Sequence, residues 1–192
     1  MRLVLASASP RRAELLRAAG FDFEAIPAHV DEAMDAEETP DGYARRVAQL
    51  KAEAVAARAP GRPVLGADTI VVVDHQVLGK PADVDEAKQM LRLLSGRAHI
   101  VLTAVCLLNP AAGARRVQTG VARTTVEFAP LSPEEVDWYA ASGEPLDKAG
   151  AYAVQGLAAR FVTRIEGSYS NVVGLPVAVV YHLCTGAGLL VS

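Results

Sequence analysis

A carboxylate inside a buried strand is the feature that most constrains this chain. Residues 65–74 read Leu-Gly-Ala-Asp-Thr-Ile-Val-Val-Val-Asp, and every position from Ile70 to Val73 is β-branched. Such an apolar run is typical of a buried strand. Asp68 stands within this run, where an uncompensated carboxylate would be costly. We therefore expect a hydrogen bond, a cation or a chemical role for Asp68.

Length and charge narrow the class of protein. The chain has 192 residues, 51% of them hydrophobic, which is enough for one substantial core or two closely joined lobes. The formal net charge of −3 argues against nucleic acid as a partner. An anionic ligand must then be held by a local group of cations.

Cysteine, histidine and hydropathy patterns argue against a zinc site and indicate a reducing compartment. Cys106 and Cys184 lie in apolar runs and are expected to be buried free thiols, and four scattered histidines argue against a zinc site. Residues 1–6 form too short an apolar run for a signal peptide. Residues 175–191 contain His182 and several helix breakers, so they predict a buried C-terminal helix rather than a membrane span. A cytoplasmic protein that does not associate with membranes is expected.

The N-terminal segment predicts a strand, a loop and a capped helix. A strand over residues 3–6 precedes Ser9 and Pro10, which fit an N-cap and a first helical position, and Gly20 fits the end of the helix. A helix N-terminus surrounded by hydroxyls and guanidinium groups suits phosphate. An ordinary capped helix with solvated arginines is the alternative. The candidate phosphate-binding residues are Ser7, Ser9, Arg11 and Arg12.

An acidic loop and a long helix follow. Residues 27–38 are loop-like and rich in carboxylates, most of which are expected to be solvated surface. One or two of them could bind Mg²⁺ if the loop faces the cleft, and spacing alone does not select which. Thr39 and Pro40 predict the start of a helix over residues 41–58. Its expected apolar face consists of Val47, Leu50, Ala54 and Val55. Lys51 neighbours that face and either points inward or extends along the surface to water.

The remaining elements alternate irregularly and include one long hairpin. The central strand predicts a short hairpin to residues 77–78. Further expected elements are a helix from Asp83 to Ser95, strands over 99–108 and 115–128 joined by a turn at 109–113, a helix from Ser132 to Gly143, a strand over 161–165, a polar loop over 166–171 and a helix from Pro176 to about Thr185. This order predicts an α/β fold with a mixed, partly antiparallel sheet, flanking helices and a cleft at the sheet's edge.

Five blocks of sequence, in order along almost the whole chain, together resemble the Maf family of nucleoside triphosphate pyrophosphatases. Any one block is a weak signal, whereas five in the same order are specific. The blocks are residues 7–12 (Ser-Ala-Ser-Pro-Arg-Arg), 66–69 (Gly-Ala-Asp-Thr), 79–81 (Gly-Lys-Pro), 147–152 (Asp-Lys-Ala-Gly-Ala-Tyr) and 167–176 (Gly-Ser-Tyr-Ser-Asn-Val-Val-Gly-Leu-Pro).

The resemblance implies a fold, a reaction and a set of roles. It implies a single domain over residues 1–192, with two lobes around a deep cleft and a fold related to the inosine triphosphate pyrophosphatases. It also implies hydrolysis of a nucleoside triphosphate to the monophosphate and pyrophosphate with a divalent metal cation (Mg²⁺, Mn²⁺ or Co²⁺). The segments 148–156 and 167–169 resemble the branch that acts on dTTP and UTP, with modified pyrimidine triphosphates as further candidates. By position, the resemblance implies Asp68 as proton acceptor, with Glu32, Lys51 and Lys80 as further active-site residues. It implies that Arg12, Thr69 and Gln155 determine specificity. The implied metal ligands are Asp68 and Glu32, although Asp31 is adjacent to Glu32 and could take its place.

Gln155 is the candidate for reading the base. Its amide can donate to O4 and accept from N3–H of uracil or thymine, which is the reverse of what cytosine presents. The alternative is a glutamine that satisfies backbone groups in a glycine-rich loop. Tyr152, nearby, is expected to pack in the core rather than stack on a base.

A non-enzymatic function is the second hypothesis. The chain could instead bind nucleotide without turnover, as a regulatory protein linked to cell division and septum formation. A homodimer is compatible with the apolar composition, although the sequence identifies no surface for it.

Overall fold

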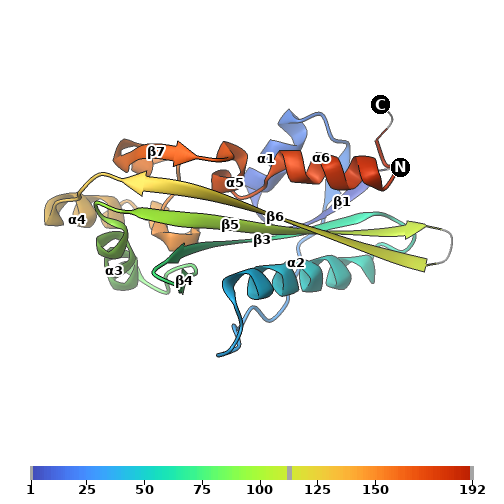
Figure 1. Cartoon of the computed structure of the whole chain (residues 1–192), viewed down its shortest axis with the longest axis horizontal. Helices are drawn as coiled ribbons and strands as arrows, with labels where there is room; N and C mark the ends of the chain where they lie inside the picture. Colours follow the sequence, from blue (N-terminus) through green and yellow to red (C-terminus); the bar gives the residue numbers. More distant parts are fainter. Residues whose placement is uncertain (1, 112–113, 191–192) are drawn as a thin grey trace. The chain divides into compact units, whose positions relative to one another are not determined.

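The chain folds around a mixed sheet, shown in the computed structural model of Figure 1, which describes residues 2–111 and 114–190. The strands follow the order β2-β1-β3-β5-β6-β7, and β4 pairs with β3. They are β1 Leu3–Ala6, β2 Phe23–Ala25, β3 Val64–Val73, β4 Gln76–Leu78, β5 Ala98–Ala111, β6 Ala114–Phe128 and β7 Val162–Glu166. The helices are α1 Pro10–Ala18, α2 Pro40–Ala56, α3 Val84–Leu94, α4 Pro133–Ala141, α5 Tyr169–Val173 and α6 Val177–Gly186, with 3₁₀ segments η1 Glu144–Asp147, η2 Ala149–Ala151 and η3 Leu157–Phe161.

The sheet is mixed, as the sequence predicts. Strand β1 pairs in parallel with both β2 and β3, whereas β4 pairs antiparallel with β3, and β7 antiparallel with β6. The turn between β3 and β4 has positive φ angles at Asp74 and His75, the conformation that a tight two-residue hairpin requires. The predicted α/β fold class is therefore confirmed.

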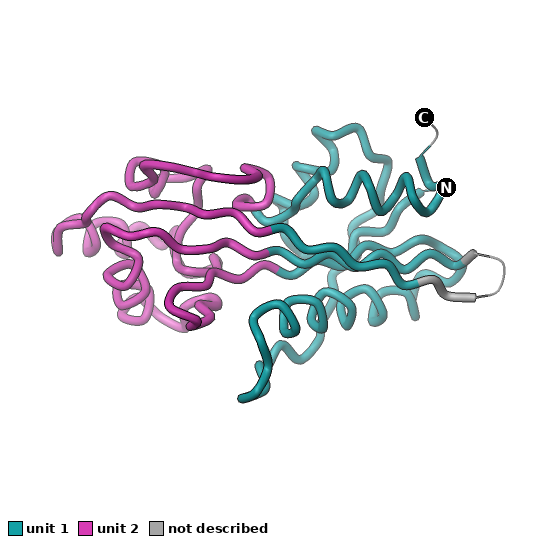
Figure 2. The backbone as a smooth tube through the Cα atoms, in the orientation of Figure 1, with its two compact units in different colours: residues 1–68, 103–122, 174–192 teal, residues 69–102, 123–173 magenta. Residues whose placement is uncertain are grey.

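The chain divides into two compact units, which are coloured separately in Figure 2. Unit 1 comprises residues 1–68, 103–122 and 174–192, and unit 2 comprises residues 69–102 and 123–173. The chain thus passes from one unit to the other four times, within β3, β5 and β6 and again between α5 and α6. The prediction of a single domain around a deep cleft remains a prediction.

In unit 1, opposite faces of β3 meet different helices. Leu65 and Ala67 lie in one hydrophobic cluster with Leu16 of α1 and with Val180 and Cys184 of α6. Successive side chains of a strand alternate between its faces, so position 66 faces the other way. A Cβ atom at Gly66 would overlap the carbonyl oxygen of Ala48 and lie 2.8 Å from the amide nitrogen of Ala52, both in α2. Figure 1 accordingly shows α2 on one side of the strands, and α1 and α6 on the other.

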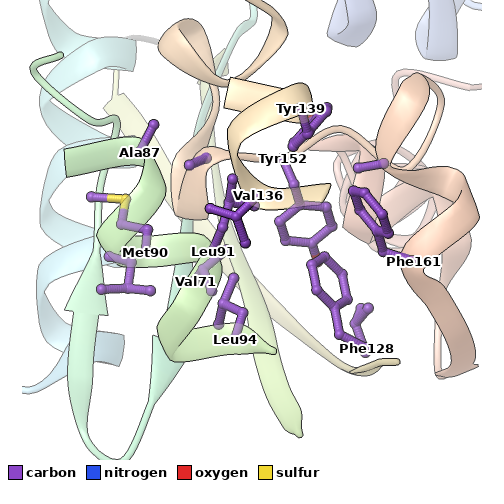
Figure 3. Packing of buried hydrophobic residues seen from close by; sticks show 14 of the residues in the cluster. Val71, Ala87, Met90, Leu91, Leu94, Phe128, Val136, Tyr139, Tyr152 and Phe161 are labelled. Atoms are coloured by element: carbon purple, nitrogen blue, oxygen red, sulfur yellow. The ribbon is translucent and has the colours of Figure 1, made fainter. Parts of the chain in front are cut away.

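Unit 2 has its own aromatic core, shown in Figure 3. Phe128 of β6 makes an edge-to-face contact with Tyr152 at 4.8 Å between ring centroids, and Tyr139 of α4 contacts Phe161 in the same way at 5.7 Å. Helix α3 contributes Leu91 and other apolar residues to this cluster. Tyr152 is 6% exposed, which confirms that it packs in the core.

The predicted helix starts are confirmed at their caps. Ser9, Thr39, Asp83 and Ser132 are N-caps whose side chains accept a hydrogen bond from the first turn of α1, α2, α3 and α4. Ser132 forms a complete capping box with Glu135.

Four expectations about the elements are wrong in part. The buried face of α2 includes Ala44, Ala48 and Ala52 rather than Leu50 and Ala54, because small residues allow close packing on the strand at Gly66. Strand β5 continues to Ala111 through the predicted turn at 109–113, of which residues 112 and 113 lie outside the described residues. The predicted polar loop over 166–171 contains the start of helix α5. Helix α6 is buried on one face only.

No helix among residues 2–111 and 114–190 is long and apolar enough to cross a membrane.

The two cysteines are buried and free, as predicted. Burial raises the pKa of the Cys106 thiol to about 12 and that of the Cys184 thiol to about 11, so both stay protonated at neutral pH.

Candidate active site

Asp68 lies on the face of β3 that meets α2. Its position two residues after Gly66 gives it the same orientation as that glycine. Asp68 is 5% exposed, and its Oδ1 accepts a hydrogen bond from Nζ of Lys51 at 2.8 Å. The other oxygen, Oδ2, is buried and has no hydrogen-bond partner among the described residues. A buried carboxylate oxygen without a partner is unusual, and it is available to a ligand, a water or a metal ion.

Lys51 is the cation that compensates Asp68. It belongs to the buried face of α2, so the inward orientation rather than the surface one is correct. Its Nζ lies 2.8 Å from Oδ1 of Asp68 and 3.0 Å from Oε1 of Glu32. One ammonium group thus lies between two carboxylates. Breaking such a buried pair leaves an uncompensated charge, which is strongly destabilising.

The acidic loop over residues 27–38 is fastened to α2. The hydroxyl of Tyr43 donates to the backbone carbonyl of Glu32 at 2.8 Å, and Arg46 donates to the carbonyl of Ala33 at 2.8 Å. Arg46 also pairs with Glu38, at 2.7 Å. These contacts hold Glu32 against Lys51, whereas the carboxylate of Asp31 accepts from the amide of Ala33. The geometry therefore favours Glu32 over its neighbour as the second carboxylate.

Tyr43 is a residue of this site that the sequence does not reveal. Burial, with the carboxylates of Asp68 and Glu32, raises the pKa of its phenol to about 12, so it remains a hydrogen-bond donor at neutral pH. A tyrosine in the first turn of an amphipathic helix carries no signal that separates it from a packing residue. Only its contact with the loop identifies it.

Arg12 is committed to backbone carbonyls. Its Nε donates to the carbonyl of Gly174 at 2.8 Å, and its Nη1 donates to the carbonyl of Ala67 at 2.9 Å, one residue before Asp68. Nη1 also lies 3.4 Å from Oγ of Ser7. Burial lowers the pKa of the guanidinium, and the carboxylates of Asp68 and Glu32 oppose this. Arg12 thus fixes the strand beside Asp68.

The other predicted phosphate-binding residues lie at the start of α1. Oγ of Ser7 accepts from the amide of Ser9 at 3.1 Å, and Oγ of Ser9 caps the helix at the amide of Arg12. Arg11 is half-buried in the first turn. These residues belong to unit 1, as do Lys51, Asp68 and Glu32, and Ser7 contacts Arg12 beside the strand of Asp68.

Thr69, Lys80 and Gln155 belong to unit 2. Thr69 is half-buried in β3, whereas Lys80 and Gln155 are exposed. The loop of Lys80 is tied to the glycine-rich segment, because the amide of Gly150 donates to the carbonyl of Gly79 at 3.0 Å.

Asp68 and Glu32 are the acidic side chains of the site that could hold a metal ion. Across residues 2–111 and 114–190, no group of three or more histidine, cysteine or acidic side chains could hold a metal ion. Mg²⁺ typically binds through one or two carboxylates together with water and substrate phosphates. Two carboxylates of this site, those of Asp68 and Glu32, fit that pattern.

The fold and the site define an α/β protein with a lysine between two acidic side chains, one of them in a buried central strand. The model of the Maf-like protein family matches residues 2–187, and the chain belongs to this family.

Similar proteins agree with that assignment. The dTTP/UTP pyrophosphatase of Koribacter versatilis is 54% identical, with 99% of this chain and 96% of that protein covered. The dTTP/UTP pyrophosphatase of Syntrophus aciditrophicus is 50% identical, with 98% of this chain and 91% of that protein covered. Among solved structures, the Staphylococcus aureus Ham1 protein has a similar fold, with a TM-score of 0.53 at 14% identity and with 97% and 99% of the two chains covered.

Proposed function

We propose that this chain is a nucleoside triphosphate pyrophosphatase that hydrolyses dTTP and UTP to the monophosphate and pyrophosphate. The observation that carries the proposal is the state of Asp68, a buried carboxylate with Oδ1 held by Lys51 and Oδ2 unpartnered among the described residues. Relatives that share about half of its residues over nearly its full length bear the name dTTP/UTP pyrophosphatase.

Asp68 acts as the proton acceptor in this proposal. A water oxygen attacks the α-phosphorus, the bond from that phosphorus to the oxygen bridging to the β-phosphate breaks, and pyrophosphate leaves. Oδ2 of Asp68 receives the proton of the attacking water. Lys51 holds the carboxylate in place through Oδ1, so the orientation of Oδ2 is set before substrate arrives.

A divalent cation completes the charge balance. Asp68 and Glu32 are the residues that would hold Mg²⁺, Mn²⁺ or Co²⁺ together with the phosphates of the substrate. When bound, the ion neutralises charge that develops on the phosphate oxygens. The chain carries a net charge of −3, so its own cations must also be concentrated locally to bind a polyanion.

The remaining roles follow from residue chemistry. Ser7, Ser9 and Arg11 contact phosphate at the start of α1, and Lys80 provides a further cation. Arg12 holds the backbone beside Asp68 and so positions this proton acceptor, in addition to serving as an anion ligand. Thr69 and Gln155 set the choice of nucleotide, with Gln155 reading O4 and N3–H of the pyrimidine. A cytoplasmic location and a homodimer remain predictions from the sequence.

A panel of nucleoside triphosphates tests the proposal. The chain is incubated with each triphosphate and Mg²⁺, and pyrophosphate and monophosphate are measured. The proposal predicts the highest kcat/KM for dTTP and UTP. Nucleotides that raise the melting temperature without any product, with Mn²⁺ or Co²⁺ as well, would support a regulatory binding protein instead. Preference for 7-methyl-GTP would contradict the assigned substrates.

A further inference from the structure

A buried tyrosine and a glutamate form a hydrogen-bonded pair next to the segment that carries Gln155. Tyr139 of α4 is fully buried, with its ring packed edge-on against Phe161 in the core of Figure 3. Its hydroxyl donates to Oε1 of Glu144 at 2.8 Å. Burial first, and the bond to Glu144 second, raise the pKa of the phenol, so the hydroxyl keeps the proton that it donates.

This pair holds both ends of the Gln155 segment. The amide of Ala153 donates to the hydroxyl oxygen of Tyr139 at 3.2 Å, and the amide of Leu157 donates to Oε2 of Glu144 at 3.0 Å. Between these two anchors, the amide of Gly156 closes a turn onto the carbonyl of Ala153 at 3.1 Å. Gln155 lies in this turn with its side chain exposed.

Gly156, the residue after Gln155, leaves room for the carboxylate of Glu144. A Cβ atom at Gly156 would overlap both carboxylate oxygens of Glu144. The carboxylate can therefore reach the amide of Leu157 only because position 156 has no side chain. The hydrogen bonds and the close approach together fix the backbone on both sides of Gln155.

We infer that Tyr139 and Glu144 are positioning residues that fix the backbone from which the Gln155 amide reaches the base, and thereby the selectivity for uracil and thymine over cytosine. The inference rests on the proposed function. Neither residue needs to touch the substrate. A glutamine amide rotated by half a turn presents its donor and acceptor in exchanged places, the pattern that suits cytosine. A loosened turn should therefore lower the selectivity between bases more than it lowers the rate of hydrolysis.

The ratio of kcat/KM for UTP to kcat/KM for CTP tests the inference. Tyr139→Phe removes the hydroxyl that serves both Glu144 and Ala153, and Glu144→Ala removes the acceptor of Leu157. Each should lower the ratio about tenfold with kcat for UTP reduced much less, since the contact to the base is disturbed and the reacting groups are not. Glu144→Gln, which keeps an oxygen able to accept from Leu157, should retain part of the ratio.

Two controls separate positioning from general stability. Ser132→Ala removes the N-cap of α4, the helix that carries Tyr139, and should lower the melting temperature without changing the ratio. Gln155→Ala should abolish most of the selectivity. If Gln155→Ala lowers the ratio but Tyr139→Phe and Glu144→Ala do not, or if Ser132→Ala lowers it equally, the inference is overturned while the proposed function stands. If the unmodified chain releases no pyrophosphate from UTP or dTTP, the proposed function fails, and the inference fails with it.

Discussion

Lys51 pairs with both acidic residues of the proposed active site. Lys51 is 9% exposed and lies between Asp68 and Glu32, at 2.8 Å and 3.0 Å. Its ammonium group compensates Asp68 through Oδ1, whereas Oδ2 of Asp68 has no hydrogen-bond partner among the described residues. The stability of this region and the orientation of the proposed proton acceptor therefore depend on the same bond.

A double-mutant cycle measures that bond. Lys51→Met should destabilise the chain by about 3 kcal/mol, because it leaves Asp68 buried and unpaired. In the background of Asp68→Asn the same substitution should cost less, since the charge to be compensated is gone. Urea unfolding of the unmodified chain, the two single variants and the double variant should give a coupling energy of about 1–3 kcal/mol. Additive effects would show that the Lys51–Asp68 pair makes no net contribution.

At the residue scale, the sequence identifies the important side chains more reliably than it predicts their hydrogen-bond partners. Asp68 stands out because a carboxylate in a β-branched run requires an explanation. The inward direction of Lys51 could not be decided from helical periodicity, because Gly66 and the small residues of α2 shift the buried face toward it. The contact of Tyr43 with the acidic loop leaves no trace in a pattern of polar and apolar residues.

At the scale of elements, the approach of α2 to β3 places the lysine. Gly66 lets the backbone of the strand meet the helix at Ala48 and Ala52, and Lys51 reaches Asp68 from the same helix face. A side chain at position 66 would force the helix away from the strand. The glycine thus serves the geometry of the site as well as the packing of the core.

Gly66→Ala should therefore be costly for stability and for activity. The added Cβ atom meets backbone atoms of α2, which cannot rotate away as a side chain could. We expect a loss of about 1–3 kcal/mol in the free energy of unfolding, together with reduced kcat for UTP. Gly186→Ala is the matched control, because a Cβ atom there meets nothing within 4 Å. Equal stability of the two variants would contradict the close approach.

Element boundaries were predictable where local chemistry sets them. The N-caps at Ser9, Thr39 and Ser132 were expected from Ser or Thr followed by Pro, and the structure has them. The turn expected at residues 109–113 was wrong at Asn109 and Pro110, where β5 continues. Pairing with the neighbouring strand overrides local turn preference there, and that pairing is not visible in a local window.

At the scale of the whole molecule, a buried histidine links folding to pH. His99 is 2% exposed in unit 2, and its Nε2 lies 2.8 Å from the hydroxyl of Tyr152. It also contacts the ring of Phe128 edge-on. Burial lowers the pKa of His99 to about 4, so the imidazole is neutral in the folded chain at neutral pH.

The chain should consequently lose stability on mild acidification. The pKa of His99 is lower in the folded state than in the unfolded state, where it is near the ordinary 6.5. The unfolded state thus binds the proton first, so this contribution is complete above pH 6.5 and is lost as the pH falls toward 4. The expected loss is about 2 kcal/mol at pH 5.

Urea unfolding at pH 7.5 and pH 5 measures this loss. His99→Gln has no titrating group at this position and should show a smaller difference between the two pH values. Other groups contribute equally to both proteins, so the comparison isolates His99. An identical pH dependence in the variant would show that another group is responsible.

Asp68 is proposed to accept the proton of the attacking water, and Asp68→Asn tests this role most directly. The amide keeps the size of the side chain but removes the basic oxygen. Asp31→Asn is the matched control, because Asp31 lies in the same acidic loop as Glu32 and bonds to a backbone amide rather than to Lys51. Pyrophosphate release from UTP at saturating substrate and Mg²⁺ gives kcat for both variants. Asp68→Asn should lower kcat by about 10²–10⁴-fold while UTP still raises its melting temperature, and Asp31→Asn should stay close to the unmodified chain. Full activity of Asp68→Asn would contradict the account.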